Sequence, residues 1–260
     1  MRKNQKTAFS IALASLMALN SLSYVGARIA WYAHGDVGAI LQRVRSVDDT
    51  GVMNYFVAGN LNQPKKAFAF LEDMVEGGIT YVNYATTTGC SMRQIIDQVL
   101  RDAKAQDCQV RVFAISMGER VARFVGAELT EAKTIAINPA PSPRILKPHV
   151  NIGVKIVAPM MEVLTVPLGW LSALPCIKGF SLACLADQWR DIAYSYDTPK
   201  PNHATIGVVC SSEDELLSNK EIADYYEGVP IVTIEGRHAD TEGNAEAYAQ
   251  ALKQLLMTFG

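Results

Sequence analysis

The feature that most constrains the fold is an alternation of short apolar segments with amphipathic ones along most of the chain. Apolar segments with few polar residues are typical of strands buried on both faces, and the amphipathic segments between them are typical of covering helices. Right-handed crossovers between such strands produce a doubly wound, mainly parallel sheet, so we predict an α/β fold. Strands are expected at 53–58, 79–85, 109–115, 133–138, 205–210 and 231–235, and helices at 65–76, 91–105, 118–129, 219–226 and 244–257.

A segment of different composition interrupts this alternation between residues 139 and 201. It contains nine of the eleven prolines and two of the three tryptophans. Because proline removes helix hydrogen bonds, we expect no long continuous helix in it. The simplest interpretation is a helical cap or lid over the carboxyl ends of the strands, where open α/β sheets bind ligands. The α/β core then consists of residues 28–138 and 202–260.

Residues 1–27 have the composition of a targeting segment. Three basic residues lie in the first six positions, an apolar run covers 8–27, and no acidic residue occurs before Asp36. This layout predicts a cleaved signal peptide or an uncleaved membrane anchor, since about 20 apolar residues are enough to span a bilayer. Either prediction places the rest of the chain outside the cytoplasm, secreted or tethered through residues 8–27. The alternative is a buried helix of a cytosolic protein.

Charge and cysteine content exclude several classes of protein. The formal net charge is −2 and the pI is about 6.1, so the chain lacks the basic surface that a nucleic-acid partner requires. A hydrophobic content of 49% excludes disorder. The five cysteines show no C-x-x-C or Cys/His spacing, so we predict no metal site. Cys176 and Cys184 are close enough in sequence to pair in an oxidising compartment.

The sharpest chemical motif is Val112-Phe-Ala-Ile-Ser-Met-Gly118. Ser116 follows an apolar strand and precedes a predicted helix, with small residues two positions before it and two after. A nucleophile on a tight strand-to-helix turn needs that pattern, because the strained backbone leaves no room for bulk beside it. The helix N-terminus favours developing negative charge, and the amide of Met117 would be one oxyanion donor. The alternative is a serine that only caps the helix.

With this A-x-S-x-G elbow the sequence resembles the α/β-hydrolase family, some of whose lipases have the same motif. The resemblance implies the chain order serine, acid, histidine. Asp214 follows the strand at 205–210 as the family's acid does, and the flanking Glu213 and Glu215 are the alternatives. His238 lies between the last strand and the last helix, where the family has its general base.

The resemblance also implies a second oxyanion donor after the strand at 53–58. The family usually has His-Gly before the donor; here Ala58-Gly59 precedes Asn60, whose amide takes the role. Glu119, directly after the elbow region, is a second departure, and we expect its carboxylate to face away from the reacting carbonyl. The segment 28–52 is short, which suits a reduced sheet without the two antiparallel strands that open the family's full sheet.

Taken together, these residues predict a serine hydrolase that cleaves carboxylic esters through an acyl-enzyme, without a cofactor or a metal. A lipophilic small-molecule substrate is expected, because the lid would roof the site with Met160, Met161, Leu164 and Trp170. The same triad serves acyltransferases, amidases and carbon–carbon hydrolases, and the fold does not separate them. Haloalkane and epoxide hydrolases are disfavoured, because they have Asp in place of Ser116.

Two alternatives belong to other classes. One is a catalytically silent binding protein that keeps the fold, and an intact Ser, Asp and His in family order argues against it. The other is a membrane-tethered interaction module whose lid docks a partner. Reaction with a fluorophosphonate probe discriminates the first from an enzyme. Loss of partner capture on lid mutation, with capture intact after Ser116→Ala, would identify the second.

Overall fold

The computed structural model describes residues 40–59, 63–83, 92–168 (backbone only from 161), 190, 193, 199, 202 and 205–258. Its strands are β1 (Leu41–Arg45), β2 (Val52–Val57), β3 (Gly78–Val82), β4 (Gln109–Ile115), β5 (Lys133–Ile137), β6 (Ile206–Ser211) and β7 (Ile231–Ile234). Its helices are α2 (Pro64–Ala67), α3 (Met92–Ala105), α4 (Gly118–Glu128), α5 (Pro148–Leu168), α7 (Asn219–Tyr225) and α8 (Ala245–Thr258), with 3-10 turns η1 (Ala69–Leu71) and η2 (Pro143–Ile145).

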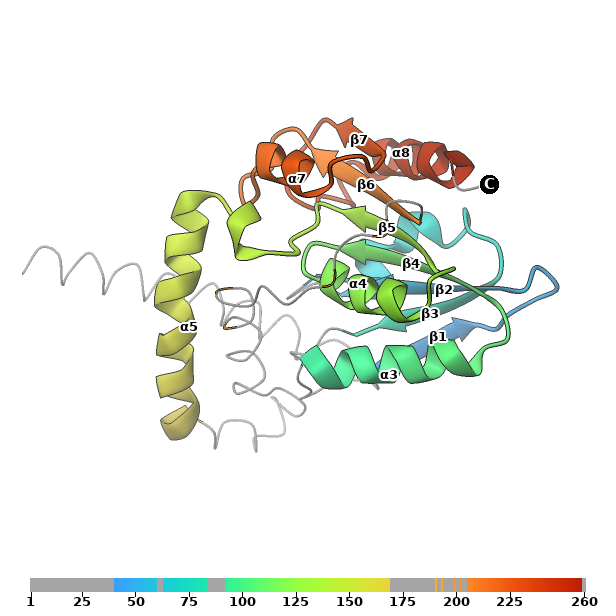
Figure 1. The fold of residues 1–260 in the computed structure, drawn as a ribbon, viewed down its shortest axis with the longest axis horizontal. Coiled ribbons are helices and arrows are strands. Elements are labelled where there is room, and N and C mark those ends of the chain that lie inside the picture. The colour runs from blue at the N-terminus through green and yellow to red at the C-terminus, as the bar shows by residue number, and fades with distance from the viewer. Residues whose placement is uncertain are drawn as a thin grey trace, which may run out of the picture.

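The strands form one seven-stranded sheet in the order β1-β3-β2-β4-β5-β6-β7 (Figure 1). Strands β2 to β7 are parallel, and β1 pairs with β3 in the antiparallel sense. The predicted doubly wound, mainly parallel α/β fold is therefore confirmed. The segment before residue 52 supplies one antiparallel edge strand, so the sheet is less reduced than the shortness of that segment suggested.

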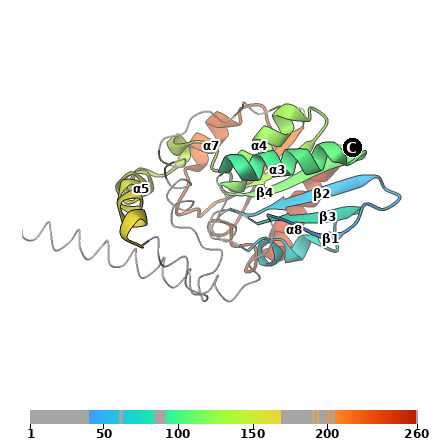
Figure 2. The same ribbon diagram turned by 90° about the horizontal axis from the view of Figure 1, so that it is seen from below.

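Both faces of the sheet are covered because successive side chains of each strand point to opposite sides. Tyr55 and Val57 of β2 belong to the cluster under α3, α4 and α7. Phe56, between them, belongs to the cluster under α2, η1 and α8. Figure 2 shows α3 and α4 on one face and α8 on the other. This explains why the strands read as unbroken apolar runs.

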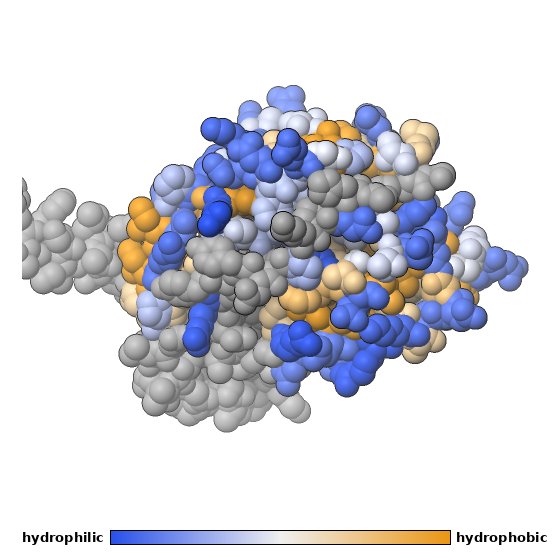
Figure 3. All heavy atoms as spheres, in the orientation of Figure 1, coloured by the Kyte–Doolittle hydropathy of each residue, from blue (hydrophilic) through white to orange (hydrophobic). Residues whose placement is uncertain are grey.

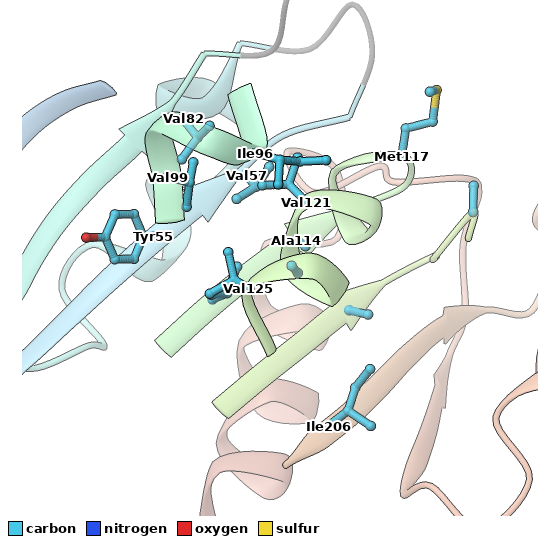
Figure 4. Packing of buried hydrophobic residues seen from close by; sticks show 14 of the residues in the cluster. Tyr55, Val57, Val82, Ile96, Val99, Ala114, Met117, Val121, Val125 and Ile206 are labelled. Atoms are coloured by element: carbon cyan, nitrogen blue, oxygen red, sulfur yellow. The ribbon is translucent and has the colours of Figure 1, made fainter. Parts of the chain in front are cut away.

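The two clusters differ in character. Under α3 and α4 the packing is mostly aliphatic, and Figure 4 shows Val57, Val82, Ile96 and Val121 converging between the helices and the sheet. The other face has more aromatic contacts: the Phe56 ring stacks on that of Phe68 at 4.9 Å between centroids. Both clusters reach the carboxyl ends of the central strands, because Val57 of β2 belongs to the first and Ile115 of β4 to the second.

The helix predicted at 65–76 is wrong in length. The chain makes only α2 and then η1, separated by Phe68, whose backbone leaves the helical region. The side chains of Phe68 and Leu71 are fully buried against the sheet. Beyond them the Arg45 guanidinium binds carbonyls of the loop that follows, at Glu72, Val75 and Gly77. Burial of the aromatic residue and this guanidinium stabilise a turn in place of a continuous helix.

The expectation that residues 139–201 hold no long helix is also wrong, because α5 is continuous over 21 residues. Pro148 opens it at the first position, where no intrahelical hydrogen bond is lost. Pro159 lies inside it on the exposed side. Its ring removes one backbone bond, and the burial of Val154 and Ala158 on the inner side offsets that loss. In Figures 1 and 2, α5 stands beyond the end of the sheet.

Several sequence-based predictions fall outside the described residues. These are the targeting segment 1–27, the pairing of Cys176 with Cys184, and the second half of the predicted lid from 169 to 189. Within the parts of the chain that the structure describes, no helix has the length and apolar character required to cross a membrane.

Candidate active site

Ser116 lies on a sharp turn between β4 and α4. Its φ is 53°, in the left-handed region, which costs a residue other than glycine about 1–2 kcal/mol. Backbone hydrogen bonds hold it there: its amide donates to the carbonyl of Ile137 at 2.8 Å, and its carbonyl accepts from the amide of Ala140 at 3.1 Å. Hydrogen bonds from the end of β5 and the loop after it therefore hold the turn in place. The strained backbone at Ser116 is the conformation that a nucleophile elbow requires.

The small residues around the elbow are required by close backbone approach. A Cβ at Gly118 would lie 2.4 Å from the carbonyl oxygen of Val57. A Cβ at Gly59 would lie 2.9 Å from the Cβ of Ser116 and 3.0 Å from the carbonyl oxygen of Ile115. The ends of β2 and β4 thus pack backbone against backbone, and a side chain at either glycine would displace the serine.

The structure brings Ser116, His238 and Asp214 together in one hydrogen-bonded chain. His238 Nε2 lies 3.1 Å from Ser116 Oγ, and His238 Nδ1 lies 2.7 Å from Asp214 Oδ2. Ser116 directly follows β4, Asp214 lies in the loop after β6, and His238 lies in the loop after β7. The loops after β4, β6 and β7 meet, with β5 between β4 and β6, because parallel strands have their carboxyl ends at one edge of the sheet.

The flanking glutamates differ from Asp214 in burial and in contacts. Glu213 and Glu215 are exposed, whereas Asp214 is 2% exposed. Glu215 has a separate role: its Oε2 accepts the backbone amide of His238 at 3.0 Å and ties the histidine loop to the acid loop. The carboxylate that contacts the imidazole ring is therefore that of Asp214.

Asp214 is surrounded by donors. Its Oδ1 accepts the amides of Leu216 and Leu217, each at 2.8 Å, and its Oδ2 accepts Nδ2 of Asn138 at 2.6 Å. Burial by itself would raise the pKa of Asp214, but the hydrogen bond and charge of His238, with the amide donors, outweigh it and lower that pKa. The carboxylate is therefore ionised at neutral pH and available to orient the imidazole ring.

Sequence reasoning missed the contact with Asn138. This residue follows β5 directly, is fully buried, and has a φ of 44°. Its amide oxygen accepts from Ser211 Oγ at 3.1 Å and from the hydroxyl of Tyr248 at 3.2 Å. The only signal in the sequence is a polar residue after the apolar end of a strand, a signal that many loop residues share.

Of the two predicted oxyanion donors, the structure describes only Met117, which is the N-cap residue of α4. Its role as a donor stays a prediction. Asn60 lies outside the described residues. Glu119, in the first turn of α4, is fully buried; its Oε1 accepts from Tyr226 at 2.7 Å and lies 3.1 Å from Nε of Arg123. Burial raises the pKa of Glu119, against the opposing effect of the arginines.

The predicted lid residues are placed only in part. Met160 lies on α5 and is 41% exposed. Met161 and Leu164 lie on the same helix, with side chains outside the description, and Trp170 lies outside it altogether. The start of the helix is attached to the acid loop, because the amide of Lys147 donates to the carbonyl of Leu216 at 2.9 Å.

Comparison with known proteins identifies the fold. Neither a family model nor a curated protein sequence matches this chain. Among solved structures, an enol-lactonase from Burkholderia xenovorans is similar over 84% of this chain and 96% of its own, with a TM-score of 0.58 and 11% identity. A hydrolase from Pseudomonas aeruginosa is similar over 83% and 93% respectively, with a TM-score of 0.60 and 14% identity.

A third similar structure is a type II thioesterase of the yersiniabactin biosynthetic pathway. It covers 85% of this chain and 100% of its own, with a TM-score of 0.56 and 16% identity. At these identities the similarity concerns the path of the backbone. Together with the sheet order and the serine turn at the end of β4, it shows that the chain has the α/β-hydrolase fold.

Proposed function

We propose that this protein is a serine hydrolase that cleaves carboxylic esters through an acyl-enzyme. The observation that carries the proposal is the hydrogen-bonded chain from Ser116 through His238 to Asp214, which begins on a strained turn. The fold supports it, because solved structures similar to this chain include an enol-lactonase and a type II thioesterase. A lactonase cleaves a cyclic ester and a thioesterase cleaves a thioester, and both bonds have an acyl carbonyl.

In the proposed reaction Ser116 Oγ attacks the ester carbonyl while His238 Nε2 accepts its proton. Asp214 holds the imidazole in the required tautomer and stabilises the imidazolium that forms. The amides of Met117 and Asn60 are the proposed donors to the oxyanion. His238 then returns the proton to the leaving alkoxide, and water, activated by the same imidazole, releases the acid.

The proposed substrate is a lipophilic small ester. Exposed apolar side chains of α5, those of Ile152, Ile156 and Met160, recur at every fourth residue. Figure 3 shows apolar surface along this edge of the molecule. These side chains lie on the side of α5 opposite the buried Val154 and Ala158. An apolar lid over the carboxyl ends of the strands would favour an aliphatic or aromatic acyl group over a charged one. The basic and apolar composition of residues 1–27 further suggests an extracytoplasmic enzyme, secreted or tethered.

The test is labelling of the full-length chain, in detergent, with a fluorophosphonate probe. The wild type, Ser116→Ala and the matched control Ser212→Ala are compared, because Ser212 is an exposed serine of the acid loop. Labelling and p-nitrophenyl ester turnover are expected in the wild type and the control and absent from Ser116→Ala. A series of acyl chain lengths, with an acyl thioester as competitor, then identifies the preferred acyl group.

A folded wild type that is neither labelled nor active would overturn the hydrolase proposal and favour a silent binding protein. Partial labelling that persists in Ser116→Ala would place the nucleophile elsewhere.

A further inference from the structure

The acid of the proposed triad, Asp214, has a second side-chain partner besides the histidine. Nδ2 of Asn138 lies 2.6 Å from Asp214 Oδ2, the oxygen that also lies 2.7 Å from His238 Nδ1. The Asn138 side chain is fully buried. One carboxylate oxygen is thus shared between an amide and an imidazole, and any change in the amide reaches the imidazole through a single atom.

The orientation of this amide is fixed by what surrounds it. A carboxylate oxygen only accepts, so the group 2.6 Å from it is the NH2 of Asn138, and the amide oxygen points the other way. There it meets Ser211 Oγ at 3.1 Å and the Tyr248 hydroxyl at 3.2 Å, and these two hydroxyls lie 2.8 Å apart. The Ser211 and Tyr248 hydroxyls have one hydrogen each for these three contacts. Only one of the two hydrogens can lie between the two hydroxyls, so at least one is donated to the amide oxygen of Asn138.

The backbone conformation of Asn138 is a second, simpler reason for an asparagine at this position, and an experiment must separate it from the hydrogen bonds of the side chain. Its φ of 44° is one that asparagine tolerates better than most residues, so the type could be set by the turn alone. Glycine would satisfy that requirement more easily. It would also leave Oδ2 of Asp214 without its amide donor, and Ser211 and Tyr248 without the amide oxygen that they contact.

We propose that Asn138 is a positioning residue of the active site, oriented by Ser211 and Tyr248, which holds Oδ2 of Asp214 toward the imidazole and sets the basicity of His238. The proposal rests on the proposed hydrolase function. By donating to Oδ2, the amide takes up part of the negative charge that would otherwise bind the imidazolium. Without it the carboxylate is more basic and less constrained, so His238 keeps its proton to higher pH and the ring is held less firmly.

The experiment compares Asn138→Gly, Asn138→Asp and Tyr248→Phe in the full-length protein. Glycine and aspartate both tolerate the backbone conformation, so they separate the amide from the turn. The matched control is Asn54→Ala, because Asn54 is equally buried and donates to the carbonyls of Glu76 and Gly78 at the opposite end of the sheet. The readouts are the pH profile of kcat/KM, kcat and KM separately, thermal unfolding, and the proton NMR signal of His238 Nδ1–H.

In Asn138→Gly we expect kcat to fall about ten- to hundred-fold at unchanged KM, because a hydrogen bond to a charged group is lost. The acidic limb of kcat/KM should move to higher pH, and the Nδ1–H signal should shift. Asn138→Asp should add an ionisation to the profile, since two carboxyl groups in contact share a proton. Tyr248→Phe should move the limb in the same direction by less, and Asn54→Ala should lower only the melting temperature.

Unchanged kcat and an unchanged acidic limb in Asn138→Gly, with reduced thermal stability, would overturn the proposal and leave Asn138 a turn residue. If glycine prevents folding, Asn138→Asp and Tyr248→Phe decide by the same criteria. The NMR signal is measured without turnover. If the Nδ1–H signal shifts between the wild type and Asn138→Gly but the wild type has no hydrolase activity, the hydrolase proposal is refuted and the coupling is kept. If the wild type is active and the signal does not shift, only the coupling is refuted.

Discussion

Gly59 and Ser116 lie in contact across the ends of two neighbouring strands, and a methyl group at position 59 would lie 2.9 Å from the serine Cβ. In Gly59→Ala the serine turn or the loop after β2 must therefore move. We expect the rate of fluorophosphonate labelling to fall at least about tenfold, because small displacements of reacting groups are costly. Second-order labelling rates measure this.

Gly126→Ala is the matched control for that substitution. Its Cβ would meet only Thr134 Oγ1, at 3.8 Å, and position 126 lies inside α4. Labelling should be unchanged and stability should rise by about 0.5–1 kcal/mol, the difference between glycine and alanine in a helix. Equal labelling of the Gly59 and Gly126 variants would show that the contact with Ser116 carries no function.

Asp214→Asn tests the charge of the proposed catalytic acid. We expect kcat to fall roughly 10³- to 10⁴-fold, the loss seen when a triad aspartate becomes an amide, while the exposed Glu213→Gln leaves it unchanged. A similar loss in both variants would contradict the assignment of the acid.

The same substitution predicts a dependence of stability on pH. The folded-state pKa of Asp214 lies below its ordinary value of 3.8, so its ionised form stabilises the fold above pH 3.8, and this contribution is lost as pH falls through the folded-state pKa. The difference in free energy of unfolding between wild type and Asp214→Asn should therefore shrink between pH 6 and pH 3, as urea titrations would measure. A constant difference would show that this carboxylate titrates alike in the folded and unfolded states.

Two acidic residues of α4 should lose very different amounts of stability when each is replaced by alanine. Glu119 is fully buried with Arg123 and Tyr226, so Glu119→Ala should cost about 3–5 kcal/mol by leaving a buried guanidinium without its counterion. Glu128 pairs with Lys104 where both side chains are about half exposed, and Glu128→Ala should cost less than about 1 kcal/mol. Urea unfolding compares them, and equal costs would refute the argument from burial.

The two sides of α5 should respond differently to polar substitution. Ile156 is 55% exposed, so Ile156→Ser should change stability by no more than about 0.5 kcal/mol. Ala158 is 1% exposed, and Ala158→Asp should cost about 2 kcal/mol or more by burying a carboxylate. Thermal unfolding would measure both. A large loss in Ile156→Ser would mean that this side is covered in solution.

The parallel strands could be predicted because burial on both faces leaves an unmistakable run of apolar residues. The bounds of β4 agree with the predicted 109–115, and those of β5, β6 and β7 agree within a residue or two. The first antiparallel strand could not be predicted, because β1 has three exposed residues and its pairing is supplied by β3. Its sequence carries no apolar pattern from which to recognise a strand.

The helices were less predictable where tertiary contacts override local preference. Phe68 ends α2 because its ring is buried against Phe56, and nothing local to residues 65–76 reveals that partner. In α5 the opposite occurred: prolines forbid a helix by local rules, and packing on its inner side maintains one. Both errors come from contacts that are distant in sequence.

In the candidate site, too, the residues marked by local sequence could be predicted and those brought together by distant contacts could not. Ser116, Asp214 and His238 could be located because each lies within four residues of the end of a strand, and a strand is the element best predicted here. The Asn138 network could not, because its members lie on four different segments and each has an ordinary local explanation. Only the assembled sheet shows that their side chains meet.

The hydroxyl of Tyr248 reaches the Asn138 amide across 110 residues of chain. A ribosome that adds about 5–20 residues per second needs about 5 to 20 seconds to cover that interval. During that time the nascent chain contains Ser116 but lacks α8, and so the hydroxyl that contacts the Asn138 amide. The Asn138 network can therefore form only after every strand of the sheet has been synthesised, since β7 ends at Ile234.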